Sequence, residues 1–357
     1  RYRSLRLPRS IMPPLTRKWP RHEMLLEELV KLTQHHREAC QPYRDYVDSL
    51  FPEAARASDL RDLPYLPVRA FKQFDLKSVP EQDVYKVMRS SGTSGHFSRI
   101  FLDRDTARKQ TLALSRCFAD HFGPGRFPML VIDSKKTIAD RTSFSARTAG
   151  INGFSMFSRG RCFALDDDLI PDFDTINDFL AANSGKMIFI FGFTSVIWGN
   201  FLKTLEKTGQ RPNLENAFML HGGGWKKLEA ERVSNDSFKA RIRDLTGCSS
   251  VHNYYGMVEQ TGTIFIECEF GRMHATPLSG VMTRDPTTHR PLDHGETGLI
   301  QVLSSIQDSY PGHSILTEDI GRTFAGETCG CGRDGSIVQI DGRLPQAEVR
   351  GCSDAYP

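Results

Sequence analysis

The chain has 357 residues, of which 39% are hydrophobic and 25% are charged, and its formal net charge is +3 at pH 7. These proportions are typical of a soluble globular protein with one large domain or two medium ones. The near balance of charge gives no reason to expect nucleic-acid binding, and no apolar run is long enough for a transmembrane helix. The eight cysteines are not spaced as in a small secreted disulfide scaffold, so we expect a reducing, cytoplasmic environment.

Helical periodicity is the first signal along the chain. Apolar residues recur at helical spacing through residues 20–60, and the prolines within residues 63–68 then favour extended backbone. Short strands are expected at 84–88 and 100–102, on either side of a loop of small residues.

Beyond that loop, helices alternate with buried strands. A helix with Asp105 as a possible N-cap is expected over residues 105–121. Buried strands are expected at four short apolar runs, namely Met129–Asp133, Met187–Phe191, Ala217–Leu220 and Val251–Tyr255. This alternation predicts an α/β architecture, in which ligands bind beyond the carboxyl ends of the strands. From Thr263 onward, shorter strands and more frequent turns predict a smaller β-rich region.

The loop of small residues is Ser90-Ser91-Gly92-Thr93-Ser94-Gly95. Glycine permits positive φ, so successive backbone N–H groups can point into one concavity and hold phosphate oxygens, and the hydroxyls add further donors. The loop lacks the helix-opening Gly-Lys-Ser/Thr ending of a Walker motif. Taken alone, it is equally typical of an ordinary Ser/Gly hairpin turn.

Further along the chain, four residues have side chains that suit a bound nucleoside triphosphate. Tyr255 could stack on a base, and Glu259 offers oxygen ligands to Mg²⁺. Asp319 could accept hydrogen bonds from both ribose hydroxyls, and Arg343 could offset charge on a phosphate. The sequence therefore favours a site for ATP with Mg²⁺.

A set of cysteines and one histidine predicts a metal site. Cys268, His274, Cys329 and Cys331 offer three thiols and an imidazole, which is a tetrahedral set for Zn²⁺. All four positions would be filled by protein, so the site would be structural and closed. The alternative is a set of free cysteines and a surface histidine.

These motifs resemble those of the adenylate-forming superfamily of acyl-CoA synthetases and luciferases. Within it, the chain is most similar to the acyl-protein synthetases of the bacterial bioluminescence fatty-acid reductase system, and next to phenylacetate-CoA ligases. The resemblance covers roughly residues 60–352 and rests on Ser90–Gly95, the Tyr255–Glu259 signature, Thr317–Asp319 and Arg343. Departures are Val258 and Glu318, where Thr and Gly are usual, and the missing lysine after the phosphate loop, for which Arg99 could substitute.

The resemblance implies roles for individual residues. It assigns ATP binding to Ser90, Ser91, Gly92, Thr93, Ser94, Gly95, Gly222, Gly223, Tyr255, Gly256 and Asp319. It assigns catalytic roles to Glu259 and Arg343, with Arg343 at the hinge to a second domain. It also supports zinc, because some phenylacetate-CoA ligase relatives carry this metal on a similar Cys-His-Cys-Cys set.

The resemblance also implies a domain organisation. An adenylate-forming domain of layered sheets and flanking helices, with a barrel-like region, is expected over residues 1–340, followed by a hinge and C-terminal stub at 341–357. Its parts are a helical and extended segment (1–85), an α/β core (86–262) and a β-rich, zinc-bearing region (263–340). The usual C-terminal subdomain is expected to be absent.

Cys352 matches the cysteine that accepts the acyl group in acyl-protein synthetases. Arg350 could lower the pKa of its thiol and so raise the thiolate fraction. The alternative is a terminal cysteine on a tail.

The resemblance therefore implies a ligase that activates a carboxylic acid, expected to be apolar or fatty, as an acyl-adenylate. The acyl group would pass to a protein thiol and on to an acyl-accepting, reductase or carrier protein. Two alternatives stay open. One is a ligase to coenzyme A or a carrier protein that uses a C-terminal subdomain from outside this sequence, and the other is a non-catalytic nucleotide-binding scaffold.

Overall fold

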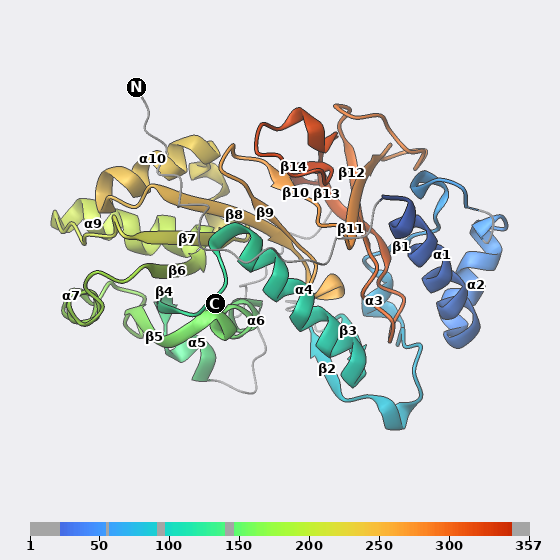
Figure 1. The fold of residues 1–357 in the computed structure, drawn as a ribbon, viewed down its shortest axis with the longest axis horizontal. Helices are drawn as coiled ribbons and strands as arrows, with labels where there is room; N and C mark the ends of the chain where they lie inside the picture. The colour runs from blue at the N-terminus through green and yellow to red at the C-terminus, as the bar shows by residue number, and fades with distance from the viewer. Residues whose placement is uncertain (1–21, 55–56, 91–96, 140–145, 345–357) are drawn as a thin grey trace.

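The computed structural model describes residues 22–54, 57–90, 97–139 and 146–344. Their main feature is a 12-stranded sheet with the order β11-β12-β13-β14-β10-β9-β8-β7-β6-β4-β5, in which β1 pairs with β13 off this path (Figure 1). Its strands are β1 (Leu66–Pro67), β4 (Phe127–Ser134), β5 (Ser158–Leu165), β6 (Ile188–Phe193), β7 (Ala217–Gly222), β8 (Ser250–Gly256), β9 (Ile264–Glu267), β10 (Met273–His274), β11 (Ser279–Arg284), β12 (Gly298–Ser304), β13 (Ser314–Phe324) and β14 (Ile337–Arg343).

One half of the sheet is parallel and consists of β5, β4, β6, β7 and β8. The other half is antiparallel and continues from β8 through β9, β10, β14, β13 and β12 to β11. The four predicted apolar runs form β4, β6, β7 and β8, which confirms the α/β class. The strands β4, β6 and β7 are largely buried, whereas most residues of β8, which was expected to be a buried strand, are half-buried. The parallel edge strand β5 is exposed over part of its length, and the apolar pattern does not reveal it. Within the described ranges the antiparallel half continues the same open sheet, so the expected barrel-like region is wrong.

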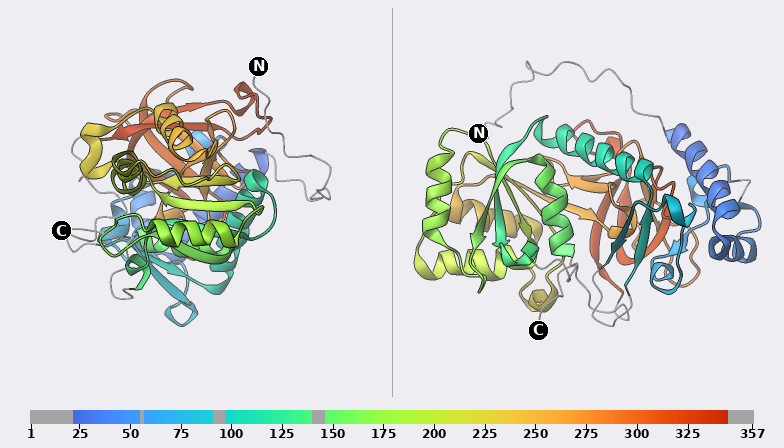
Figure 2. Two further views of the ribbon diagram at one scale, coloured as in Figure 1. Left: turned by 90° about the vertical axis from the view of Figure 1, so that its left-hand side faces the viewer. Right: turned by 90° about the horizontal axis from the view of Figure 1, so that it is seen from below.

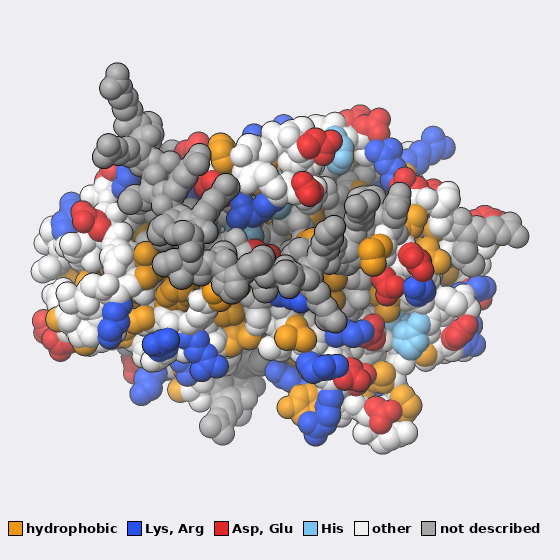
Figure 3. Space-filling view, in the orientation of Figure 1, with side chains coloured by type: hydrophobic (Ala, Val, Ile, Leu, Met, Phe, Trp, Pro, Cys, Tyr) orange, Lys and Arg blue, Asp and Glu red, His pale blue; other side chains and the backbone are white. Residues whose placement is uncertain are grey.

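Helices lie on both sides of this sheet (Figure 2). They are α1 (His22–Ala39), α2 (Gln41–Leu50), α3 (Ala70–Gln73), α4 (Arg104–Phe122), α5 (Lys136–Ala139), α6 (Ala146–Phe154), α7 (Phe173–Ala182), α8 (Thr194–Val196), a π-helical segment (Ile197–Leu202), α9 (Lys203–Thr208) and α10 (Asn235–Thr246). None of the helices in the described ranges is both long and apolar enough to cross a membrane. Charged side chains of both signs are interspersed on the face shown in Figure 3.

The helix α4 packs against both halves of the sheet. Its C-terminal residues Cys117, Phe118 and Phe122 belong to the apolar core of the parallel half, whereas Ala107 packs against the core of the antiparallel half. The helix begins one residue earlier than the sequence suggests. Asp103, not Asp105, is its N-cap, because the Asp103 Oδ1 accepts a hydrogen bond from the Thr106 backbone N–H at 2.7 Å.

A separate two-stranded antiparallel sheet consists of β2 (Lys86–Arg89) and β3 (Arg99–Leu102), close to the predicted strands. These strands flank the predicted phosphate loop. The Ser90 backbone N–H donates to the Ser98 carbonyl at 3.1 Å, and the Ser98 N–H donates to the Ser90 hydroxyl at 3.0 Å. The base of the loop is therefore closed by hydrogen bonds.

Two buried histidines join α1 to the loop that precedes β13. The imidazole rings of His36 and His313 stack with their centroids 5.0 Å apart. The Nε2 of His36 donates to the Gln307 carbonyl at 3.0 Å, and its Nδ1 lies 2.7 Å from the Ser78 hydroxyl. The Nε2 of His313 lies 3.0 Å from the Thr33 hydroxyl, while its buried Nδ1 has no hydrogen-bond partner among the described residues.

Burial lowers the pKa of both histidines, to about 3 for His313, and the neighbouring imidazoles add to the effect. Both rings are therefore neutral in the folded chain, whereas in the unfolded chain they protonate below about pH 6.5. Their contribution to stability is present above that pH and is lost as the pH falls.

We expect acid to destabilise the fold through these rings. Each should remove up to about 1.4 kcal/mol of unfolding free energy per pH unit below about 6.5. His313→Gln should therefore reduce the slope of unfolding free energy against pH by close to one proton between about pH 6 and about pH 4.5. Urea unfolding over that range measures the slope. His289→Asn, at an exposed histidine, is the control, and equal slopes for the two variants would contradict the expectation.

Candidate active site

The carboxyl ends of β6, β7 and β8 lie at one edge of the sheet, since these strands are parallel. The Gly222–Gly224 turn follows β7, and Gly256 ends β8. A Cβ at Gly222 would fall 2.4 Å from the Tyr254 ring, so only glycine leaves room for that ring. Gly222, Gly223 and Gly256, which the resemblance assigns to ATP binding, therefore lie at one edge of the sheet.

One carboxylate joins three predicted site residues. The Tyr255 hydroxyl donates to the Asp319 Oδ2 at 2.6 Å, and the Arg343 Nε donates to the Oδ1 at 3.0 Å. Tyr255 ends the parallel half of the sheet, whereas Asp319 and Arg343 face each other on β13 and β14. The Asp319 backbone N–H also donates to the Thr317 hydroxyl at 3.1 Å.

Burial and the Asp319 charge raise the pKa of Tyr255 well above its usual value. Its hydroxyl therefore stays protonated and remains a donor. Asp319 is 9% exposed, and an ionised carboxylate has roughly four lone-pair sites. With one bond on each oxygen, it can still accept two ligand hydroxyls.

Glu259 lies beside this group, in the single turn Val258–Gln260 that follows β8. It is 7% exposed. Burial raises the pKa of its carboxyl, while Ser98 and the positive charges of Lys72 and Arg343 oppose that rise. Since Ser98 closes the base of the predicted phosphate loop, Glu259 lies next to that base.

Lys72 places a positive charge near Glu259, and the sequence did not single it out. It lies on α3, far from Glu259 in sequence, and no motif marks it. The strand β1 brings α3 to the site, because it pairs in parallel with β13 just before Thr317. Arg69 forms an ion pair with Glu318 at the same place. Arg99, the possible substitute for the missing lysine, pairs with Asp75 at 2.8 Å.

Several predicted residues lie outside the described ranges. These are Ser91, Gly92, Thr93, Ser94 and Gly95 of the loop, together with Arg350 and the proposed acyl acceptor Cys352.

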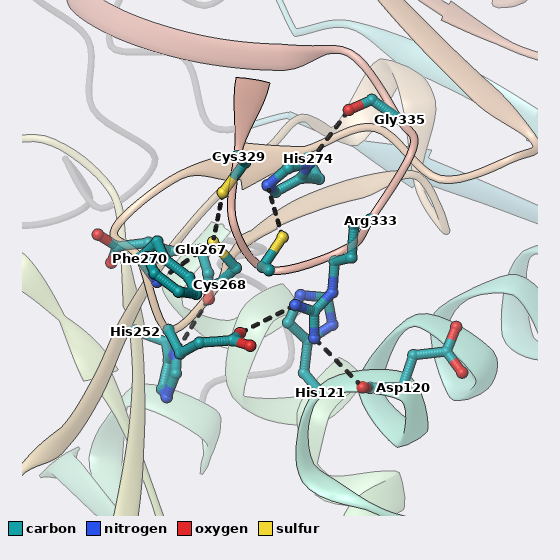
Figure 4. Close-up of polar contacts among 12 residues, drawn as sticks. Asp120, His121, His252, Glu267, Cys268, Phe270, His274, Cys329, Arg333 and Gly335 are labelled. Atoms are coloured by element: carbon teal, nitrogen blue, oxygen red, sulfur yellow. Dashed lines mark hydrogen bonds and ion pairs between the residues drawn. The ribbon is translucent and has the colours of Figure 1, made fainter. Parts of the chain in front are cut away.

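The four predicted metal ligands converge where β9 ends and β10 begins, beside the loop between β13 and β14 (Figure 4). Their ligand atoms all lie within 4.8 Å of one another. The Sγ atoms of Cys268 and Cys329 are 3.7 Å apart, and the Cys331 Sγ lies 3.3 Å from the His274 Nε2. Two thiolates on one tetrahedral Zn²⁺ lie about 3.8 Å apart, so the spacing fits this ion.

The surroundings of the cluster also suit a metal. The His274 Nδ1 lies 3.1 Å from the Gly335 carbonyl, which can only accept a hydrogen bond, so Nδ1 carries the hydrogen and the Nε2 lone pair faces the thiols. The Phe270 backbone N–H donates to the Cys268 Sγ at 3.4 Å. Arg333 lies nearby and pairs with Glu269 at 2.9 Å.

The architecture defines a class of protein. A 2-hydroxyisobutyryl-CoA ligase in complex with 2-HIB-AMP superposes with a TM-score of 0.69, over 94% of this chain and 72% of that chain, at 16% sequence identity. An open conformation of the same ligase, in complex with 2-HIB-AMP and CoA, gives a TM-score of 0.69 over 94% and 75% of the two chains, also at 16% identity. The chain therefore has the fold of adenylate-forming ligases.

The family follows from the sequence comparison. The family model "Acyl-protein synthetase, LuxE" matches residues 16–356, and the chain belongs to this family. A long-chain-fatty-acid–luciferin-component ligase of Vibrio harveyi is 24% identical over 342 residues, which are 93% of this chain and 87% of the relative. Its namesake in Aliivibrio fischeri is 26% identical over 278 residues, or 73% and 69% of the two chains.

These comparisons confirm the family, the ligase class and the acyl-protein synthetase activity predicted from the sequence. The roles of individual residues, the zinc ion and the domain boundaries stay predictions.

Proposed function

We propose that the chain activates a long-chain fatty acid with ATP at the carboxyl edge of its sheet and transfers the acyl group to the thiol of Cys352. The observation that supports this site most is the shared contact of Tyr255 and Arg343 with Asp319, beside Glu259. The names of the relatives in Vibrio harveyi and Aliivibrio fischeri support the choice of a long-chain acid.

In the first step, a carboxylate oxygen of the fatty acid attacks the α-phosphorus of ATP, and pyrophosphate leaves. Asp319 would accept hydrogen bonds from the ribose hydroxyls, and Tyr255 would border the base. Arg343 would stabilise negative charge on the phosphate, so the chain contributes mainly positioning and charge stabilisation.

Glu259 fits the chemistry of a Mg²⁺ ligand. Mg²⁺ is commonly held by one or two carboxylates together with substrate phosphates. The Glu259 carboxyl is buried, and its pKa is raised by that burial, so a cation would favour its ionised form. When bound, Mg²⁺ would offset the charge of the phosphates.

In the second step, the thiolate of Cys352 attacks the carbonyl carbon of the acyl-adenylate. The bond from that carbon to the phosphate oxygen breaks, AMP leaves, and a thioester forms. The acyl group would then pass to an acyl-accepting protein, for example a reductase.

We expect Glu259→Gln to lower fatty-acid-dependent pyrophosphate–ATP exchange by about a hundredfold, the order of effect seen when a charge-stabilising group is removed. The exposed Glu229→Gln is the matched control. Exchange by Glu259→Gln at the rate of this control would contradict the role of Glu259.

Cys352→Ser should leave that exchange intact but abolish the mass increase of one acyl group after incubation with ATP and fatty acid. Cys162→Ser, at a half-buried cysteine away from these residues, should be acylated normally. Intact mass spectrometry measures both. Exchange without acylation of the wild type would favour a ligase to coenzyme A or a carrier, and nucleotide binding without exchange would favour a scaffold.

We also propose that Cys268, His274, Cys329 and Cys331 hold a structural Zn²⁺. The close approach of the four ligand atoms and the hydrogen on the His274 Nδ1 support this assignment. A bound ion would join β10 to the loop that leads into β14, the strand that carries Arg343.

The purified chain should therefore contain about one zinc per molecule. Cys331→Ser should lose the metal and about 3 kcal/mol or more of unfolding free energy, since metal binding is coupled to folding. Metal analysis and urea unfolding test this, with Cys162→Ser as the matched control. If the purified wild type contains no stoichiometric metal, the proposal is wrong and the three cysteines are free thiols.

A further inference from the structure

The segment that carries Glu259 is held by a buried loop, residues 305–313, between β12 and β13. The Tyr310 hydroxyl donates to the Glu259 carbonyl at 2.9 Å. The side-chain amide of Gln260 donates to the Gly312 carbonyl at 2.8 Å and to the Val302 carbonyl at 3.1 Å. Glu259 is therefore hydrogen-bonded to this loop, and Gln260 is hydrogen-bonded both to the loop and to β12, the strand that precedes it.

The loop also packs closely against the backbone of Glu259 at Gly312. A Cβ at Gly312 would lie 2.8 Å from the Glu259 carbonyl oxygen and 2.3 Å from the Tyr310 ring. A glycine is therefore required for the loop to approach the Glu259 backbone this closely. Tyr310 is fully buried, so its ring has little freedom to move away.

Hydrogen bonds of Ser309 hold the loop in place on its other side. The Ser309 hydroxyl donates to the Phe101 carbonyl at 2.8 Å, and the Ser309 backbone N–H donates to the Thr106 hydroxyl at 3.1 Å. These bonds connect it to β3 and to the first turn of α4. Tyr310 is thus a fixed donor, and its pKa is raised by burial and by the Glu259 charge, so it keeps its proton.

We propose that Tyr310 is a positioning residue for Glu259. Its hydroxyl fixes the Glu259 carbonyl, which sets where the carboxylate points, while Lys72 and Arg343 supply positive charge near that carboxylate. This inference rests on the proposed function, in which Glu259 holds the Mg²⁺ of MgATP. Loss of the hydroxyl should therefore weaken the response to MgATP and not only the stability of the fold.

Tyr310→Phe keeps the ring and removes only the hydroxyl. Tyr43→Phe is the matched control. The hydroxyl of Tyr43, on α2, is also buried and lies 3.4 Å from the Nε2 of His313, a residue of the same loop as Tyr310. Within the described ranges it forms no hydrogen bond with Glu259. Both variants are compared with the wild type in urea unfolding, in thermal stabilisation by MgATP, and in fatty-acid-dependent pyrophosphate–ATP exchange.

We expect Tyr310→Phe to need about fivefold more MgATP for half-maximal thermal stabilisation and for half-maximal exchange, as for the loss of one hydrogen bond. Raising the Mg²⁺ concentration should restore most of its exchange rate. Tyr43→Phe should lose stability but keep the MgATP dependence of the wild type. Equal MgATP dependence of the two variants would overturn the inference.

If Tyr310→Phe does not fold, Gly312→Ala provides the second test, because its methyl group would displace the Tyr310 ring or the Glu259 carbonyl. It should raise the MgATP requirement in the same way, and an unchanged requirement would overturn the inference. These experiments distinguish failure of the proposed function from failure of this inference. If the wild type catalyses no pyrophosphate–ATP exchange, the proposed function is wrong. If the wild type catalyses exchange but the two tyrosine variants have the same MgATP dependence, only the role of Tyr310 is wrong.

Discussion

The buried carboxylate of Asp319 constrains the site more than any other group. An ionised carboxylate inside a protein is costly unless it is paired and hydrogen-bonded. Here the Tyr255 hydroxyl bonds one oxygen and the Arg343 guanidinium bonds the other. The three residues come from β8, β13 and β14, so satisfying this one charge fixes the edge where the parallel half of the sheet meets the antiparallel half.

That junction explains why the candidate site lies where it does. Each half of the sheet has its own apolar core, and the helix α4 contributes to both. The turn that contains Glu259 comes directly after the last parallel strand, where the chain reverses into β9. A ligand bound at this edge would therefore contact residues from both halves of the sheet. The four proposed metal ligands lie at the opposite end of β9 from the Glu259 turn and share none of these residues.

The sequence predicted those parts of the molecule that depend on local patterns. Continuous apolar runs identified β4, β6 and β7, because strands buried on both faces carry few polar residues. The strand β8 was predicted as well, but most of its residues are only half-buried. The edge strand β5 was missed, since Arg159, Gly160 and Arg161 give it no such pattern. Cysteine spacing identified the four clustered ligands. Neither Lys72 nor Tyr310 could be found in this way, because their proximity to Glu259 depends on the pairing of distant segments and not on a motif.

The loop of residues 305–313 shows how a part of the chain without site residues can still influence the site. On one side it bonds the backbone of Glu259 through Tyr310. On the other side His313 stacks on His36 of α1 and lies 3.0 Å from Thr33. The N-terminal helices thus reach the candidate Mg²⁺ ligand through one buried polar loop. Removing the partner of a buried polar group destabilises a fold. The docking of these helices and the position of Glu259 therefore involve the same loop, through different hydrogen bonds.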